Sequence, residues 1–193
     1  MTLEDSSINE VLDSYLVKLK EAQDSMNKDE VLNMFQTLLD IRRKGSVLFL
    51  AGNGGSSTTS QHFAVDLGIG GIHRNSIIRS ISLSDSQGAI TALANDRNFE
   101  SVFEAQLSVL AREGDSLMVI SASGNSKNLI NVVSKAKSRG MITLGLLGFD
   151  GGELRKICDQ SVLVKTEKGE YGIVEDIHLS VCHIFTEALR STI

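Results

Sequence analysis

The stretch VLFLAGNGGSSTTSQHF, from Val47 to Phe63, says most about the fold of this chain. The apolar run that opens it predicts a buried strand, and a loop of glycine and hydroxyl residues separates this run from a helical stretch. Small residues leave the backbone N–H groups of such a loop uncovered, and the partially positive N-terminus of the next helix lies at the same place. We therefore expect a strand, an anion-binding loop and a helix in succession.

The same pattern returns in LMVISASGNSKNLINVV, from Leu117 to Val133. The first loop has no Lys-Ser/Thr pair after its glycines and no GxGxxG spacing, so neither a Walker loop nor a dinucleotide-binding loop is indicated. For each loop alone, the alternative is a turn that merely caps a helix. Together they make a phosphorylated small molecule the leading ligand class. The residues expected to hold it are Asn53, Gly54, Gly55, Ser56, Ser57, Ser121, Ala122, Ser123 and Ser126.

From Val47 onward, short apolar runs alternate with helical stretches. This alternation predicts an α/β fold of three layers, with a five-stranded parallel sheet covered by helices on both faces. Ligands of such sheets bind beyond the carboxyl ends of the strands, where both loops fall. The expected strands are 47–51, 77–83, 117–121, 143–147 and 161–164, and the expected helices are 56–67, 87–94, 100–112, 126–138, 151–157 and 174–191.

Residues 4–45 show apolar positions at helical spacing, with Asn27 and Asp29 able to break or cap the pattern in between. We expect an antiparallel helix pair that covers a sheet face or a partner subunit. No linker or low-complexity segment divides the chain. The expected organisation is one domain over residues 1–193, with the helical pair in 1–45 and an α/β core in 46–193.

Composition narrows the classes of function. The 193 residues carry a net charge of −5, which argues against a broad nucleic-acid surface and means that backbone amides and hydroxyls must bind a phosphate. The sequence shows neither a long apolar stretch nor a signal-peptide pattern, so we expect a cytoplasmic protein without a membrane partner. Cys158 and Cys182 lack metal-type spacing and are expected to be free thiols.

Two groups of ionisable residues are candidates for acid–base chemistry. His62 and Asp66 lie four residues apart after the first loop and share one helix face, although a surface ion pair would have the same spacing. Near the C-terminus, the apolar stretch IVEDIHLSVCHIF contains Glu175, His178 and His183. A lone histidine there would be a core residue, but several ionisable groups on one mostly buried helix must each find a partner.

Four segments resemble the SIS (sugar isomerase) family, and within it the phosphoheptose isomerases. They are GNGGSxxxxQHFAxDL, TALANDRNFExVF, GDSLMVISASGNSxNLINVV and LGFDGGEL. The resemblance runs from about residue 30 to the C-terminus. It implies the SIS fold and an aldose–ketose isomerase, most similar to enzymes that convert sedoheptulose 7-phosphate to D-glycero-D-manno-heptose 7-phosphate for surface polysaccharides.

The resemblance also assigns site residues. Asp66 stands where the family has a catalytic glutamate, and His183 where it has a catalytic histidine. Some members bind zinc, and the positions that match its ligands are His62, Asp66, Glu175 and His183. Asn95 and Asp96 match a substrate-contacting pair, with a plain helix end as the alternative, and Glu175 is also expected near the substrate. The family's habit implies a homotetramer with active sites at subunit interfaces.

The chain departs from the family pattern at three positions. Asp66 replaces a glutamate, Glu175 replaces a glutamine and Ile173 replaces an arginine, which adds negative charge near an anionic substrate. An isomerase of another phosphosugar therefore remains an alternative. A second alternative is a non-catalytic SIS protein that binds a phosphosugar or a protein partner. Such a protein needs no histidine at position 183, so His183 favours an enzyme.

Overall fold

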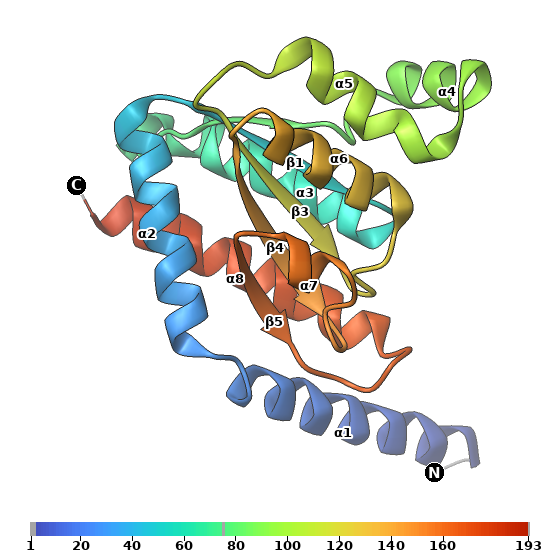
Figure 1. Cartoon of the computed structure of the whole chain (residues 1–193). Helices are drawn as coiled ribbons and strands as arrows, with labels where there is room; N and C mark the ends of the chain where they lie inside the picture. Colours follow the sequence, from blue (N-terminus) through green and yellow to red (C-terminus); the bar gives the residue numbers. More distant parts are fainter. Residues whose placement is uncertain (1–2, 75, 193) are drawn as a thin grey trace.

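The structure, a computed structural model, describes residues 3–74 and 76–192. Within them, five strands form one parallel sheet in the order β2-β1-β3-β4-β5 (Figure 1), which confirms the predicted architecture. Only β2 is clearly shorter than expected, because it is an edge strand that pairs with β1 from Arg79 to Ser82. The strands are β1 (Val47–Gly52), β2 (Arg79–Ser82), β3 (Ser116–Ser121), β4 (Ile142–Gly148) and β5 (Gln160–Val164).

The helices agree with the predicted ones apart from their ends. The helix expected from residue 151 begins only at Leu154, because Gly151 and Gly152 have φ angles of 83° and 53°, which no α-helix contains. No helix in the described part of the chain has the length and apolar character needed to cross a membrane. The helices are α1 (Leu3–Asp24), α2 (Lys28–Lys44), α3 (Gly55–Leu67), α4 (Gln87–Asp96), α5 (Val102–Leu110), α6 (Lys127–Ser138), α7 (Leu154–Ile157) and α8 (Tyr171–Ser191), with 3₁₀ segments η1 (Ile69–Arg74) and η2 (Phe99–Ser101).

Side chains along each strand point alternately to the two faces of the sheet, and each face carries its own hydrophobic core. In β1, Leu48 and Leu50 pack with buried residues of α2, α3 and α8. Phe49 and Ala51 point the other way and pack with α5, α6 and α7. Successive side chains of a strand face opposite sides, so a strand covered by helices on both faces must be apolar throughout.

The order of the strands places both glycine-serine loops at one point. β1 and β3 are neighbours, but the chain leaves β1 through α3 toward β2 and leaves β3 through α6 toward β4. The two connections therefore diverge to opposite sides (Figure 1) and open a crevice at the carboxyl ends of β1 and β3.

Two helices precede the first strand, as predicted, but they do not pack as an antiparallel pair. α1 and α2 diverge from the turn that joins them (Figure 1), and α1 packs on the N-terminal part of α8 instead. The Tyr15 hydroxyl donates a 2.7 Å hydrogen bond to Asp176, which raises the pKa of Tyr15 to about 12. Lys18 forms a 2.7 Å ion pair with Glu170. These polar contacts, together with the packing of Tyr15, Leu19 and Ala22 on the core that includes α8, hold α1 against α8. No helical pattern reveals the polar contacts.

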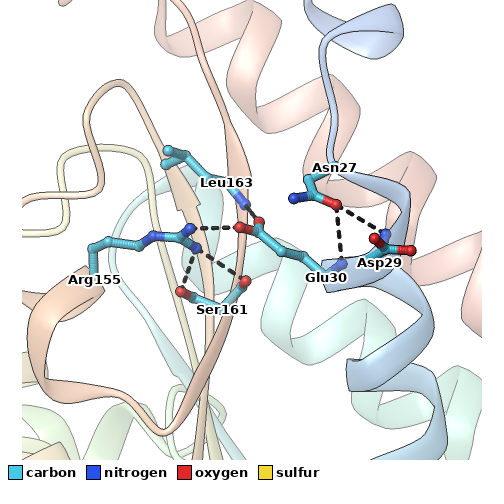
Figure 2. Close-up of polar contacts among 6 residues, drawn as sticks. All are labelled: Asn27, Asp29, Glu30, Arg155, Ser161 and Leu163. Atoms are coloured by element: carbon cyan, nitrogen blue, oxygen red, sulfur yellow. Dashed lines mark hydrogen bonds and ion pairs between the residues drawn. The ribbon is translucent and has the colours of Figure 1, made fainter.

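Helix α2 is anchored to the edge strand β5 (Figure 2). Asn27 caps its N-terminus, and Glu30 in its first turn accepts a 3.2 Å hydrogen bond from the backbone N–H of Leu163. The other carboxylate oxygen of Glu30 pairs with Arg155, which also donates to the backbone and hydroxyl oxygens of Ser161. The cluster covers an edge that would otherwise expose unpaired backbone groups.

Replacing Glu30 by Ala should lower the free energy of unfolding by about 2 kcal/mol, because the half-buried Arg155 guanidinium and the Leu163 N–H would lose their acceptor. Urea unfolding monitored by circular dichroism measures this loss. Asp40→Ala is the matched control on the same helix: its ion pair with Arg43 is exposed, so the loss should stay within about 0.5 kcal/mol. Equal losses in the two variants would contradict an anchoring role for Glu30.

Candidate active site

A cavity of about 200 Å³ lies in the crevice at the ends of β1 and β3. Both loops line it, so the structure brings together the two segments that the sequence singled out. Gly54, Gly55 and Ser57 belong to the first loop but are not among the lining residues. The lining residues are Asn53, Ser56, Ile120, Ser121, Ala122, Ser123, Ser126, Leu129, Tyr171 and Glu175.

The two helices that begin at this cavity have no side-chain cap. The N-cap residues of α3 and α6, Gly54 and Ser126, make no capping hydrogen bond, whereas Asn27 and Ser86 cap α2 and α4. The first backbone N–H groups of a helix need acceptors from outside the helix. The N–H groups of Ser57 and Leu129 already donate to backbone carbonyls within the first turns of α3 and α6. Among the described residues, the N–H groups of Gly55, Ser56, Lys127 and Asn128 remain for a ligand, and their partial positive charge favours an anion.

The DGGE segment, residues 150–153, packs against the second loop and fixes its conformation. The Asn125 side chain donates to the Ser123 carbonyl (2.9 Å) and accepts from the backbone N–H of Glu153 (3.0 Å). Gly124 has a φ of 65°, and a Cβ on it would collide with the carbonyl of Gly151. The LGFDGGEL motif thus supports the loop without lining the cavity.

Glu175 lies in the cavity beside the first loop. Its carboxylate occupies the space that a Cβ on Gly55 would fill, at the start of α3. This position suits a carboxylate, because the N-terminus of a helix attracts negative charge. The negative charge of Glu175 would repel a second anion, such as a phosphate, at this end of the cavity.

His62, Asp66 and His183 converge where α3 and α8 pack side by side. The Nε2 atoms of the two histidines are 3.1 Å apart, and Asp66 Oδ2 lies 3.3 Å from His62 Nε2 and 4.0 Å from His183 Nε2. The exposed fractions of the side chains are 47% for His62, 24% for Asp66 and 51% for His183, so a ligand can reach all three. Residues from two distant parts of the sequence thus form one acid–base cluster.

The same three residues have the chemistry of a zinc site. Zinc takes nitrogen and oxygen ligands at about 2.1 Å, which places two ligands of a tetrahedral ion about 3.4 Å apart. The three distances in the cluster, 3.1, 3.3 and 4.0 Å, are close to that value. All three donor atoms lie within 4.8 Å of one another, and three protein ligands leave a position for substrate. The donor set therefore fits zinc.

Two expected groups lie outside this cluster. The Glu175 carboxylate is on the cavity side of α8, eight residues before His183, and does not join the three converging donors. Asn95 and Asp96 end α4, where the Asn95 amide donates to the Asp96 carboxylate at 3.0 Å on an exposed surface. Neither of these two residues lines the cavity.

Sequence reasoning missed two residues of the site. Tyr171 starts α8, lines the cavity and packs edge-on against Phe149, with ring centroids 5.1 Å apart. Asn128, in the first turn of α6, is bonded to Asn53 of the first loop. Asn128 lies inside the SGNSKN segment (residues 123–128) that resembles the SIS family. Its polar side chain on an amphipathic helix could have pointed to it.

Two buried groups of α8 lie behind the site and have strongly shifted pKa values. Burial lowers the pKa of His178 to about 4, and the backbone of Leu147 has a smaller opposing effect. Among the described residues, neither ring nitrogen of His178 has a partner with hydrogen-bond geometry. Burial also raises the pKa of Cys182, and the nearby charge of Asp66 adds to the effect. Both groups are neutral at pH 7 and belong to the core.

Comparison with known proteins places the chain in a class and then in a family. The SIS domain pattern matches residues 13–148, so the chain belongs to the SIS domain family. It is 37% identical over 176 residues to the phosphoheptose isomerase of Helicobacter pylori (strain P12), covering 91% of this chain and 88% of that protein. It is also 34% identical over 171 residues to the phosphoheptose isomerase of Nitratidesulfovibrio vulgaris, covering 86% of this chain and 79% of that protein.

Solved structures agree with this assignment. The structure of the phosphoheptose isomerase from Neisseria gonorrhoeae matches with a TM-score of 0.85 at 27% identity, covering 99% of this chain and 100% of that chain. The phosphoheptose isomerase from Francisella tularensis, 23% identical, shares the fold with a TM-score of 0.84. Within the SIS domain family, the chain is a member of the phosphoheptose isomerases and hence an intramolecular isomerase.

Proposed function

We propose that the protein converts sedoheptulose 7-phosphate to D-glycero-D-manno-heptose 7-phosphate, a step toward heptose-containing surface polysaccharides. One observation carries this proposal: the cavity and the acid–base cluster lie at two points along the same pair of helices. On α3, about 9 Å of helix rise separates Ser56 in the cavity from His62, and on α8 about 12 Å separates Glu175 from His183. A phosphorylated sugar chain can reach from one point to the other.

The orientation of the sugar follows from the charges in the cavity. None of the described residues that line the cavity is basic, so the phosphate would bind to amides and hydroxyls, which Ser121, Ser123, Ser126 and the start of α6 supply. The carboxylate of Glu175 faces the first loop and suits sugar hydroxyls better than a phosphate.

Isomerisation moves a proton between C1 and C2 of the sugar. In our proposal, Asp66 removes a proton from C1 of the ketose while His183 donates a proton to the carbonyl oxygen at C2, which yields the enediol. Return of a proton to C2 and loss of the C1 hydroxyl proton then give the aldose. Asp66 Oδ2 faces the two imidazoles, and the side chain of Asp66 is 24% exposed, so a substrate can reach its carboxylate.

A metal ion would replace part of this scheme, because a histidine Nε2 that binds zinc cannot also donate a proton. His62, Asp66 and His183 would hold zinc, whereas Glu175, the fourth ligand expected from the sequence, lies too far along α8 to join them. When bound, zinc would supply Lewis-acid polarisation of the sugar carbonyl. The half-exposed imidazoles leave the substrate side of the cluster open.

We also propose a cytoplasmic homotetramer with active sites at subunit interfaces. Support comes from α4, which has no buried residue although it carries Asn95 and Asp96, and from an exposed apolar stripe on α1. The two unpaired cysteines suit a reducing compartment. Native mass spectrometry tests the assembly, and a monomer would contradict it. The residues of the stripe are Ile8, Val11, Leu12, Leu16 and Val17.

The function is tested by incubating the protein with sedoheptulose 7-phosphate, with and without added zinc, and following the reaction by NMR. We expect the anomeric signals of the heptose 7-phosphate to appear. A flat spectrum under both conditions would exclude this substrate. A panel of other phosphorylated ketoses then tests the alternative that the Glu175 carboxylate selects another phosphosugar.

A further inference from the structure

The side-chain amides of Asn53 and Asn128 join the two loops of the site. Asn53 Nδ2 donates to Asn128 Oδ1 and Asn128 Nδ2 donates to Asn53 Oδ1, both at 2.9 Å. Asn53 follows β1 in the first loop, whereas Asn128 lies in the first turn of α6, directly after the second loop. The pair is therefore the polar link between segments that the fold sends to opposite faces of the sheet.

The pair of hydrogen bonds between Asn53 and Asn128 depends on the exact positions of both side chains. Each amide supplies one donor and one acceptor to the other, so the pair is satisfied only when both side chains keep their positions. Asn128 is 2% exposed, and leaving such a buried amide without a partner is unfavourable. Asn53 lines the cavity, whereas Asn128 does not. A buried residue without access to the substrate thus determines how a substrate-facing residue is oriented.

We propose that Asn128 is a positioning residue, which holds Asn53 and the first loop in register with the second loop so that both bind one sugar phosphate. The inference rests on the proposed function for its substrate but not for the link itself. The phosphate end of the cavity belongs to the second loop, so loss of the link should disturb binding of the sugar portion and spare binding of the phosphate.

Asn128→Leu tests this role without adding charge near the phosphate. Hydrogen exchange of the first-loop amides, residues 52–57, should become faster in this variant. The KM for sedoheptulose 7-phosphate should rise about tenfold, equivalent to about 1.4 kcal/mol, while the Kd for inorganic phosphate changes less than about twofold. If the leucine variant does not fold, Asn128→Ser provides the same comparison with a smaller side chain.

Asn131→Leu is the matched control, because Asn131 lies on the same helix and donates to the Glu100 carbonyl away from the cavity. It should leave exchange of the first loop and KM unchanged. A lower melting temperature of the Asn128 variant with unchanged KM would overturn the positioning role, as would an equal loss of sugar-phosphate and phosphate binding. Failure of the wild type to convert the sugar refutes the proposed function alone, since the exchange measurement still tests the link.

Discussion

Replacing His183 by Gln should lower kcat about 10³-fold, the range that a positioned acid or base contributes. The expected change in KM is small, because His183 lies about 12 Å along α8 from Glu175 and the cavity. Glutamine is uncharged and similar in size, but it cannot exchange a proton near pH 7. Steady-state kinetics with sedoheptulose 7-phosphate measures both constants.

A control on the same helix separates this effect from damage to α8. Glu187→Gln changes an exposed residue about one turn further on, whose partner is Arg190, and should retain wild-type kcat. Zinc content of the His183 variant gives a second readout: loss of the ion together with activity would make His183 chiefly a ligand. Near wild-type kcat in His183→Gln would remove this residue from the mechanism.

Acidification should destabilise the protein through His178. Its pKa is about 4 in the folded state and about 6.5 in an unfolded chain, so the unfolded state binds more protons below pH 6.5. Stability contributed by the neutral ring is therefore present above about pH 6.5 and is lost as the pH falls toward 4. The loss should reach about 2 kcal/mol between pH 7 and pH 5, and about 3 kcal/mol at pH 4.

Urea unfolding of the wild type and of His178→Leu at pH 7 and pH 5 isolates this contribution. The leucine variant should lack the pH-dependent loss, because no buried ring remains to be protonated. Ile177→Val changes the neighbouring buried residue without a titratable group and should cost the same free energy at both pH values. A pH dependence that persists unchanged in His178→Leu would show that other groups cause it.

Much of the fold could be predicted from local patterns. The continuous apolar runs that begin at Val47 and Leu117 predicted buried strands, because a strand covered by helices on both faces shows no alternation of apolar and polar residues. The observed bounds of β1 and β3 lie within one residue of the predicted ones. Serine is a preferred N-cap residue, so only the structure shows that the Ser126 side chain leaves the start of α6 uncapped. Both loops then lined one cavity, as expected of strands that end at the same edge.

The partners of individual side chains could not be predicted in the same way. Glu175 and His183 share α8, yet only His183 joins His62, because positions eight apart on a helix differ in height and direction. The direction of α1 depends on Tyr15 reaching Asp176, and the link between the loops on Asn128 reaching Asn53. Each of these contacts joins residues far apart in the chain, and no local pattern encodes them.

By itself, the sequence determined the α/β architecture, the two glycine-serine loops that follow β1 and β3, and the ionisable residues available for chemistry, since helical and strand periodicity and the small residues of a loop act over a few neighbours. Only the tertiary structure decided that His62, Asp66 and His183 converge, that Glu175 faces the first loop and that α1 packs on α8 instead of on α2. The physical reason is that packing of α3 against α8 and the order of the strands bring distant segments within hydrogen-bond range.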